Sequence, residues 1–158
     1  MAADYLDVAL ITEVFFDDPT GERLQRALID AQSQGADLAL LPEIPLNRWS
    51  PASKKAIDED AEELNGWRQV LMAEAAKSVG IGLVGGAIIR DPDTEIRYNT
   101  ALLYDGQGVC HARYRKIHLP EEEGYWETSH YMPGTEPPQA IADTFSLTVG
   151  LQICSDVN

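Results

Sequence analysis

The order of β-prone and helix-prone segments limits this chain to a small set of folds. Residues 6–11 and 36–41 are short apolar runs that predict two strands. The segment between them repeats apolar residues at helical spacing and ends at Gly35, and a second helix is predicted over residues 60–79, with Gly80 at its end. Strand, helix, strand and helix in this order predict an α/β domain.

Three further strands are predicted without helices between them, over residues 81–89, 99–104 and 109–114. Consecutive strands that are joined by short turns pair antiparallel, so the sheet is expected to be mixed rather than purely parallel. Residues 117–142, rich in Pro, Gly and Glu, predict a long surface loop, and residues 145–153 predict a last strand.

The acidic composition argues against several kinds of partner. The formal net charge is −14, which would repel the phosphates of nucleic acids and the headgroups of anionic membranes. The longest apolar stretch, residues 80–89, is far shorter than the ~20 residues that cross a bilayer. We therefore expect neither nucleic acid nor a membrane as a partner. A small neutral or cationic substrate stays open beside the simpler interpretation of a solvated acidic surface.

The two cysteines, Cys110 and Cys154, are too few and too far apart for a disulfide framework. Residues 1–4 do not begin a basic segment followed by an apolar one, as a secretory signal would. A cytoplasmic protein with free thiols is the expectation.

Two familiar ligand-binding patterns are not supported. His111, His118 and His130 lack the spacing of a metal site. Residues 80–85 match the glycine pattern G-x-G-x-x-G, but that motif binds dinucleotides only where it follows a strand and opens a helix. Here it follows a helix and opens a strand, so these glycines are expected to cap the helix and to allow close packing in the sheet. Neither a metal nor a cofactor is predicted.

Three reactive side chains each follow a predicted strand: Glu43, Lys116 and Cys154. Strand ends are the places where a rigid α/β sheet presents reactive groups. Taken singly, each side chain has an ordinary alternative, as a solvated carboxylate, a surface cation or a small buried thiol.

Together the three side chains suffice for acyl transfer. A cysteine thiol has a pKa near ~8.5 and is only slightly ionised at neutral pH, so it needs a base to accept its proton. A desolvated carboxylate can be that base. Attack on an amide carbon creates an oxyanion, which a fixed ammonium and a backbone N–H stabilise. The set therefore predicts a cysteine-dependent hydrolase that needs no histidine.

Three motifs carry a resemblance to a known family: Leu41-Pro42-Glu43, Tyr114-Arg115-Lys116-Ile117-His118-Leu119 and Gly150-Leu151-Gln152-Ile153-Cys154-Ser155-Asp156. In this order and at this spacing they resemble the nitrilase superfamily of carbon–nitrogen hydrolases. The resemblance spans nearly the whole chain. It implies a mixed-sheet α-β-β-α sandwich, of which residues 1–158 would form the N-terminal portion of a single domain, truncated just after the catalytic cysteine.

The resemblance also implies a role for each residue. Glu43 would be the general base, Lys116 would stabilise the tetrahedral intermediate, and Cys154 would be the nucleophile that forms a thioester. The backbone N–H of Ser155 would be the second oxyanion donor. Family members often carry another active-site glutamate after the lysine motif, shortly before a Pro-Gly pair, and Glu127 fits this placement.

The neighbouring Glu121, Glu122 and Glu123 fit that placement less well and are expected to be solvated. The Cys-x-Asp pattern of Cys154 and Asp156 is closer to the amidase and carbamoylase branches than to nitrile-hydrolysing branches, which place Trp and Glu directly after the cysteine. The expected substrate is therefore a linear amide or an N-carbamoyl compound, hydrolysed with release of ammonia.

A second interpretation belongs to a different functional class. A truncated or catalytically inactive chain of the same fold would serve as a binding or interaction module. For the full-length protein, the resemblance implies a homo-oligomer.

Overall fold

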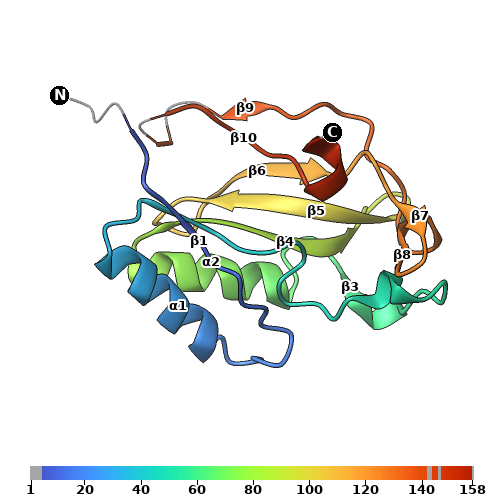
Figure 1. Ribbon diagram of the computed structural model, residues 1–158, viewed down its shortest axis with the longest axis horizontal. Coiled ribbons are helices and arrows are strands. Elements are labelled where there is room, and N and C mark those ends of the chain that lie inside the picture. Colours follow the sequence, from blue (N-terminus) through green and yellow to red (C-terminus); the bar gives the residue numbers. More distant parts are fainter. Residues whose placement is uncertain (1–4, 142–143, 146, 158) are drawn as a thin grey trace.

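The computed structural model describes residues 5–141, 144–145 and 147–157 (Figure 1). Two helices lie against a six-stranded sheet. The helices are α1 (Glu22–Ser33) and α2 (Trp67–Val79). The strands of the main sheet are β1 (Val8–Leu10), β2 (Leu38–Leu40), β3 (Ala61–Glu62), β4 (Gly82–Arg90), β5 (Arg97–Tyr104) and β6 (Cys110–Arg115). The predicted α/β class is confirmed.

The sheet is mixed, as the segment order predicted. Its strand order is β1-β2-β4-β5-β6, with β3 paired to β4. The pairs β1–β2, β2–β4 and β3–β4 are parallel, whereas β4–β5 and β5–β6 are antiparallel. In the register of the central strands, Ala101 lies opposite both Gly86 and Tyr114. The helical crossovers produce the parallel pairs and the short turns produce the antiparallel ones.

Each face of the sheet buries its own apolar cluster. Leu28 of α1 and Met72 of α2 pack with Leu83 and Leu102 on one face. On the other face, Leu103 and its neighbours are covered by the C-terminal segment through the side chains of Leu151 and Ile153. In Figure 1 the two helices accordingly lie below the sheet, and β9 (Ala140–Ile141), β10 (Val149–Gly150) and the turn that follows β10 lie above it.

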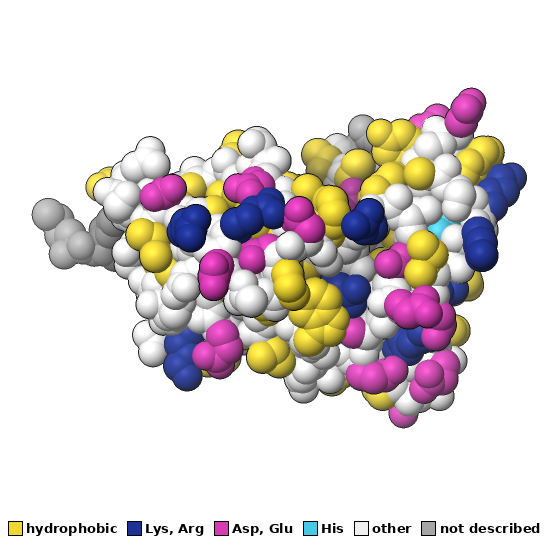
Figure 2. Space-filling model, turned by 90° about the horizontal axis from the view of Figure 1, so that it is seen from below, with side chains coloured by type: hydrophobic (Ala, Val, Ile, Leu, Met, Phe, Trp, Pro, Cys, Tyr) yellow, Lys and Arg dark blue, Asp and Glu magenta, His cyan; other side chains and the backbone are white. Residues whose placement is uncertain are grey.

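The outer surface of the helical layer carries charges of both signs. Acidic side chains lie among lysines and arginines over the face that Figure 2 shows. Within the described residues, no helix combines the length and the apolar character that crossing a membrane requires.

The predicted start of the second helix, at residue 60, is wrong. The structure places a 3-10 turn, η2 (Asp58–Asp60), and strand β3 before Gly66, and α2 begins at Trp67. The Glu62 carboxylate accepts the N–H groups of Arg68 and Gln69 at 3.0 and 3.1 Å, so it satisfies donors that the first turn of a helix leaves free. The predicted end is confirmed, because Gly80 caps α2 with a φ of 76°.

The predicted last strand over residues 145–153 is also wrong in most of its length. Residue 146 lies outside the described part of the chain. Strand β10 covers only Val149–Gly150 and pairs antiparallel with β9 (Ala140–Ile141). The chain then turns into a 3-10 helix, η4 (Cys154–Val157), because the Asp156 carboxylate accepts the Ile153 N–H at 3.3 Å and closes a local turn.

The predicted loop over residues 117–142, whose last residue lies outside the described part, contains short regular elements. They are β7 (Glu121–Glu122), β8 (Tyr125–Trp126), η3 (Glu127–Ser129) and β9, and β7 pairs with β8. The Trp49 indole N–H, beside η1 (Ser50–Ala52), donates to the Gly124 carbonyl at 2.9 Å. This contact ties the hairpin to the segment that follows β2.

Replacing Glu62 with alanine should destabilise the fold without touching the proposed chemistry. Glu62 is 8% exposed, and it also forms an ion pair with Arg68. Its removal leaves a buried guanidinium and two helix donors uncompensated, so we expect the free energy of unfolding to fall by about 3 kcal/mol. Urea denaturation measures this change.

The exposed Glu59→Ala is the control, for which we expect a change within about 0.5 kcal/mol. Equal stability of the two variants would contradict the role of Glu62 in starting α2.

Candidate active site

Lys116 is the centre of the candidate site. It follows β6, and its backbone N–H donates to the Asn99 carbonyl at 2.9 Å. The next constraint is Gly134, whose N–H donates to the Lys116 carbonyl at 2.8 Å. A Cβ on Gly134 would collide with the Arg115 carbonyl, so only glycine allows this approach. The backbone of Lys116 is therefore held on both sides.

Two carboxylates converge on the Lys116 ammonium. Its Nζ lies 2.7 Å from Glu43 Oε1 and 2.8 Å from Glu127 Oε1. The side chains of Lys116 and Glu127 are 0% and 1% exposed, whereas that of Glu43 is 19% exposed. The Asn99 amide donates to the same Glu43 oxygen at 2.7 Å. The structure thus brings together three of the residues selected from the sequence, and only Glu43 among them reaches solvent.

Backbone strain accompanies the placement of Glu43. The next residue, Ile44, has a φ of 42°, which a β-branched residue rarely adopts, and it is almost fully buried. Such a conformation costs about 1–3 kcal/mol and persists where the surroundings enforce it. Gly86 packs against this turn, where a Cβ on it would lie in ordinary van der Waals contact with the Ile44 nitrogen, at 3.5 Å. The turn after β2 is therefore packed so that Glu43 is directed toward Lys116.

The pKa values of Glu127 and Lys116 are shifted by burial and by the neighbouring groups of this cluster. Burial raises the pKa of Glu127, and the contact with Lys116 only partly offsets this increase. The Glu127 Oε2 is buried and has no hydrogen-bond partner among the described residues. Burial disfavours the Lys116 charge, but its hydrogen bonds to Glu127 and Glu43 hold the pKa of Lys116 above its usual value.

Cys154 lines a cavity together with Glu43. The cavity has a volume of about 180 Å³, and Asn99 and Gly86 also contribute to its wall. Cys154 is exposed and begins η4 with a φ of 47°, a second strained backbone position at the site. The thiol and the carboxylate selected from the sequence therefore face the same small space.

Ser155 is held by its side chain. Its hydroxyl donates to the His118 carbonyl at 2.5 Å, which ties the cysteine turn to the loop after Lys116. The role of its N–H as an oxyanion donor stays a prediction. Glu121, Glu122 and Glu123 are exposed, in contrast to Glu127.

Asn99 is a site residue that the sequence reasoning missed. It is 1% exposed and donates to Glu43, as described above. A polar residue at the start of an apolar strand was the available signal. That signal carries little weight alone, because a strand can begin at a solvated asparagine.

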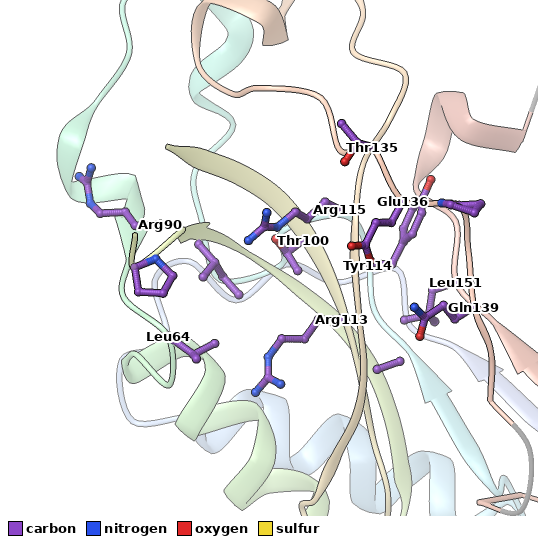
Figure 3. Close-up of a pocket in the computed structure, with 14 residues that line it drawn as sticks. Leu64, Arg90, Thr100, Arg113, Tyr114, Arg115, Thr135, Glu136, Gln139 and Leu151 are labelled. Carbon is purple, nitrogen blue, oxygen red and sulfur yellow. The ribbon is translucent and has the colours of Figure 1, made fainter. Parts of the chain in front are cut away.

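A larger cavity of about 400 Å³ lies around β6 and does not include Glu43, Lys116 or Cys154 (Figure 3). Arg113 and Arg115 extend from β6 on one side of it, and Glu136 and Gln139 lie on the other. Of the three candidate catalytic side chains, Glu43 and Cys154 line the smaller cavity, whereas none of the three lines the larger one. No group of three or more His, Cys, Asp or Glu side chains suited to a metal ion occurs among the described residues.

Comparisons with known proteins identify the family of this chain. The carbon-nitrogen hydrolase family profile matches residues 14–158. Human omega-amidase NIT2 is 35% identical over 133 residues, which are 81% of this chain and 46% of that protein. The chloroplastic omega-amidase of Arabidopsis thaliana is 31% identical over 144 residues, 84% of this chain and 37% of that protein. The chain therefore spans about half or less of the length of these relatives.

Solved structures give the same result. An amidase from Nesterenkonia sp. superposes with a TM-score of 0.72 at 26% identity, covering 95% of this chain and 56% of that one. A variant of the Nesterenkonia sp. AN1 amidase, with a TM-score of 0.73 at 25% identity over 97% of this chain and 59% of that one, carries acrylamide added to its active-site cysteine. The fold is thus that of the nitrilase-superfamily amidases. This chain belongs to the carbon-nitrogen hydrolase family.

The raised pKa of Glu127 predicts a pH dependence of stability. A group whose pKa is higher in the folded state contributes stability that is complete below its unfolded pKa, near ~4.3, and is lost as the pH rises through the folded pKa. Glu127→Gln removes this titration. The free energy of unfolding of the unmodified chain, minus that of the variant, should therefore decrease across this window, as measured by urea denaturation at several pH values.

Glu123→Gln, at an exposed position, is the matched control and should show no such slope. A difference that is flat, or that grows with pH, for Glu127→Gln would show that burial does not control this carboxyl.

Proposed function

We propose that this chain carries the active site of an amide-hydrolysing enzyme with a cysteine nucleophile. One observation carries the proposal: the Lys116 ammonium is fully buried between Glu43 and Glu127, at 2.7 and 2.8 Å, and Glu43 shares a cavity with Cys154. A buried ion cluster is costly to build for stability alone. The position of this cluster next to an exposed thiol therefore favours a catalytic role.

In the first half-reaction, Glu43 accepts the proton of the Cys154 thiol and the sulfur attacks the carbonyl carbon of the amide. The carbonyl oxygen becomes an oxyanion, which the Lys116 ammonium and the Ser155 N–H stabilise. The intermediate collapses, the C–N bond breaks, and Glu43 returns the proton to the leaving nitrogen. Ammonia departs and an acyl thioester stays on Cys154.

In the second half-reaction, Glu43 takes a proton from a water molecule, which attacks the thioester carbon. The new oxyanion is stabilised by the same donors. Its collapse breaks the C–S bond, the carboxylic acid leaves, and the proton returns to the sulfur. The cycle needs no cofactor.

Glu127 keeps the ammonium in place. Its contact at 2.8 Å fixes Nζ from the buried side, and the contact at 2.7 Å joins Nζ to Glu43, which lines the cavity.

The proposed substrate is a small linear amide or N-carbamoyl compound. The cavity beside Cys154, about 180 Å³, suits a short molecule. The Cys-x-Asp pattern and the similarity to omega-amidases favour an amide over a nitrile. We also propose a cytoplasmic location, which the two free thiols Cys110 and Cys154 support. Homo-oligomerisation, implied by the family, is tested by sedimentation.

Replacing Cys154 with alanine should abolish ammonia release from simple amides and N-carbamoyl amino acids, a loss of at least about 10³-fold in kcat. The variant removes the only atom that forms the thioester. Ammonia is measured with a coupled assay on the purified chain, and intact mass spectrometry looks for the acylated protein.

Cys110→Ala, which removes the half-buried thiol of β6, is the control and should keep full activity. Turnover that persists in Cys154→Ala would overturn the nucleophile. If no substrate is turned over but amides still bind, the alternative of a binding module would gain support.

Glu43→Gln should lower kcat by about 10²–10⁴-fold, because the amide keeps the shape of the side chain but cannot accept a proton. The exposed Glu123→Gln should have no effect. Circular dichroism verifies that both variants fold. Activity of Glu43→Gln equal to that of the unmodified chain would exclude Glu43 as the general base.

A further inference from the structure

Asp156 is a buried carboxylate to which the proposed reaction assigns no step. It lies two residues after Cys154, within η4, and its side chain is 1% exposed. A carboxylate at this depth is stable only where donors surround it.

Five donor groups satisfy Asp156, and they come from two separate segments. Oδ1 accepts the N–H groups of Ile117 and His118, at 3.2 and 2.8 Å, and faces the His118 Nδ1 at 3.0 Å. Oδ2 accepts the Tyr114 hydroxyl at 2.8 Å and the Ile153 N–H at 3.3 Å. One side chain thus bonds to residues on both sides of Lys116 and to the residue before Cys154.

The donors keep this carboxylate charged. Burial alone would raise the pKa of Asp156, but the hydrogen bonds from the His118 N–H and the Tyr114 hydroxyl outweigh burial and lower it. Charge-assisted hydrogen bonds of this kind are short and directional, so they define a geometry as well as a contact.

The cysteine turn needs such a constraint. Cys154 is exposed and its backbone has a φ of 47°, so neither burial nor local preference holds it. Strained backbone persists only where the surroundings enforce it. The Ser155 hydroxyl, bonded to the His118 carbonyl, is the second tie to the same loop.

We propose that Asp156 is a positioning residue, which holds the turn carrying Cys154 in a fixed place relative to Lys116. The inference rests on the proposed function, since it concerns the same site. Asp156 does not touch the substrate. It links the two segments by accepting the Tyr114 hydroxyl and the Ile117 and His118 N–H groups around Lys116, and the Ile153 N–H next to Cys154.

The test separates positioning from stability. Asp156→Asn keeps the size of the side chain but replaces an acceptor oxygen with an NH₂ group, which cannot accept the donors that face it. We measure amide hydrolysis, and independently the saturable labelling of Cys154 by acrylamide, followed by intact mass. Both rates are divided by the folded fraction.

We expect kcat and the maximal labelling rate to fall about tenfold to a hundredfold, because a displacement near 1 Å at the reacting atom has such an effect. KM and the half-saturating acrylamide concentration should change less than about threefold, since the cavity wall is kept. A change in stability alone would alter neither rate per folded molecule.

Asp18→Asn is the matched control. Asp18 is buried to the same degree, since as whole residues Asp18 is 5% exposed and Asp156 is 6% exposed. Its carboxylate accepts the N–H groups of Arg23 and Leu24 at the start of α1. The Asp18→Asn variant should lower Tm but leave both normalised rates unchanged.

If Asp156→Asn fails to fold, Tyr114→Phe is the second variant, because it removes a single donor from Asp156 and keeps the aromatic ring. We expect its labelling rate to fall two- to fivefold, which corresponds to the loss of a hydrogen bond of about 1 kcal/mol or less.

The outcomes distinguish the two proposals. Slower labelling in Asp156→Asn, without hydrolysis of any amide by the unmodified chain, would support positioning and overturn the proposed function. Unchanged normalised labelling in Asp156→Asn would overturn positioning even if the unmodified chain is active. If Tyr114→Phe is the only one of these two variants that folds, an unchanged labelling rate in that variant would overturn the positioning proposal.

Discussion

The rest of the site depends on the burial of one ammonium group. Lys116 is 1% exposed, and a lone cation at that depth would be strongly destabilising without compensation. Glu43 and Glu127 provide the compensation from two different loops, one after β2 and one after β8. The ammonium thus fixes the positions of both carboxyl groups, and one of them, Glu43, lines the cavity of Cys154.

A second constraint is the conformation of the backbone next to the reactive groups. Ile44 and Cys154 have φ values of 42° and 47°, and each lies at or beside a proposed catalytic side chain. Packing on Gly86 holds the first, and the hydrogen bonds of Asp156 hold the turn that contains the second. Strain of about 1–3 kcal/mol at each position shows that the fold places these groups against local preference.

The errors of the sequence-based predictions have a common cause. Residues 60–66 and 151–157 contain apolar and helix-compatible or strand-compatible residues, yet both segments form turns around a buried carboxylate, Glu62 in one and Asp156 in the other. The periodicity of apolar residues contains no information about which hydrogen-bond donors a buried carboxylate will contact. The Glu62 donors lie six and seven residues further along the chain, whereas most donors of Asp156 lie in residues 114–118, which only the folded chain brings close.

The sequence by itself determined the α/β class, the mixed sheet and the helix end at Gly80, because these follow from local periodicity and helix capping, and its strand-end positions selected Glu43, Lys116 and Cys154 as candidates. The resemblance to the family added Glu127. Tertiary structure decided how the residues meet. The Lys116 pairs span separations of 73 and 11 residues, and the contacts of Asp156 with Tyr114 and His118 span 42 and 38. Contacts at such separations depend on strand order and register, which no local pattern encodes. They bring residues that are distant in the sequence to one part of the fold.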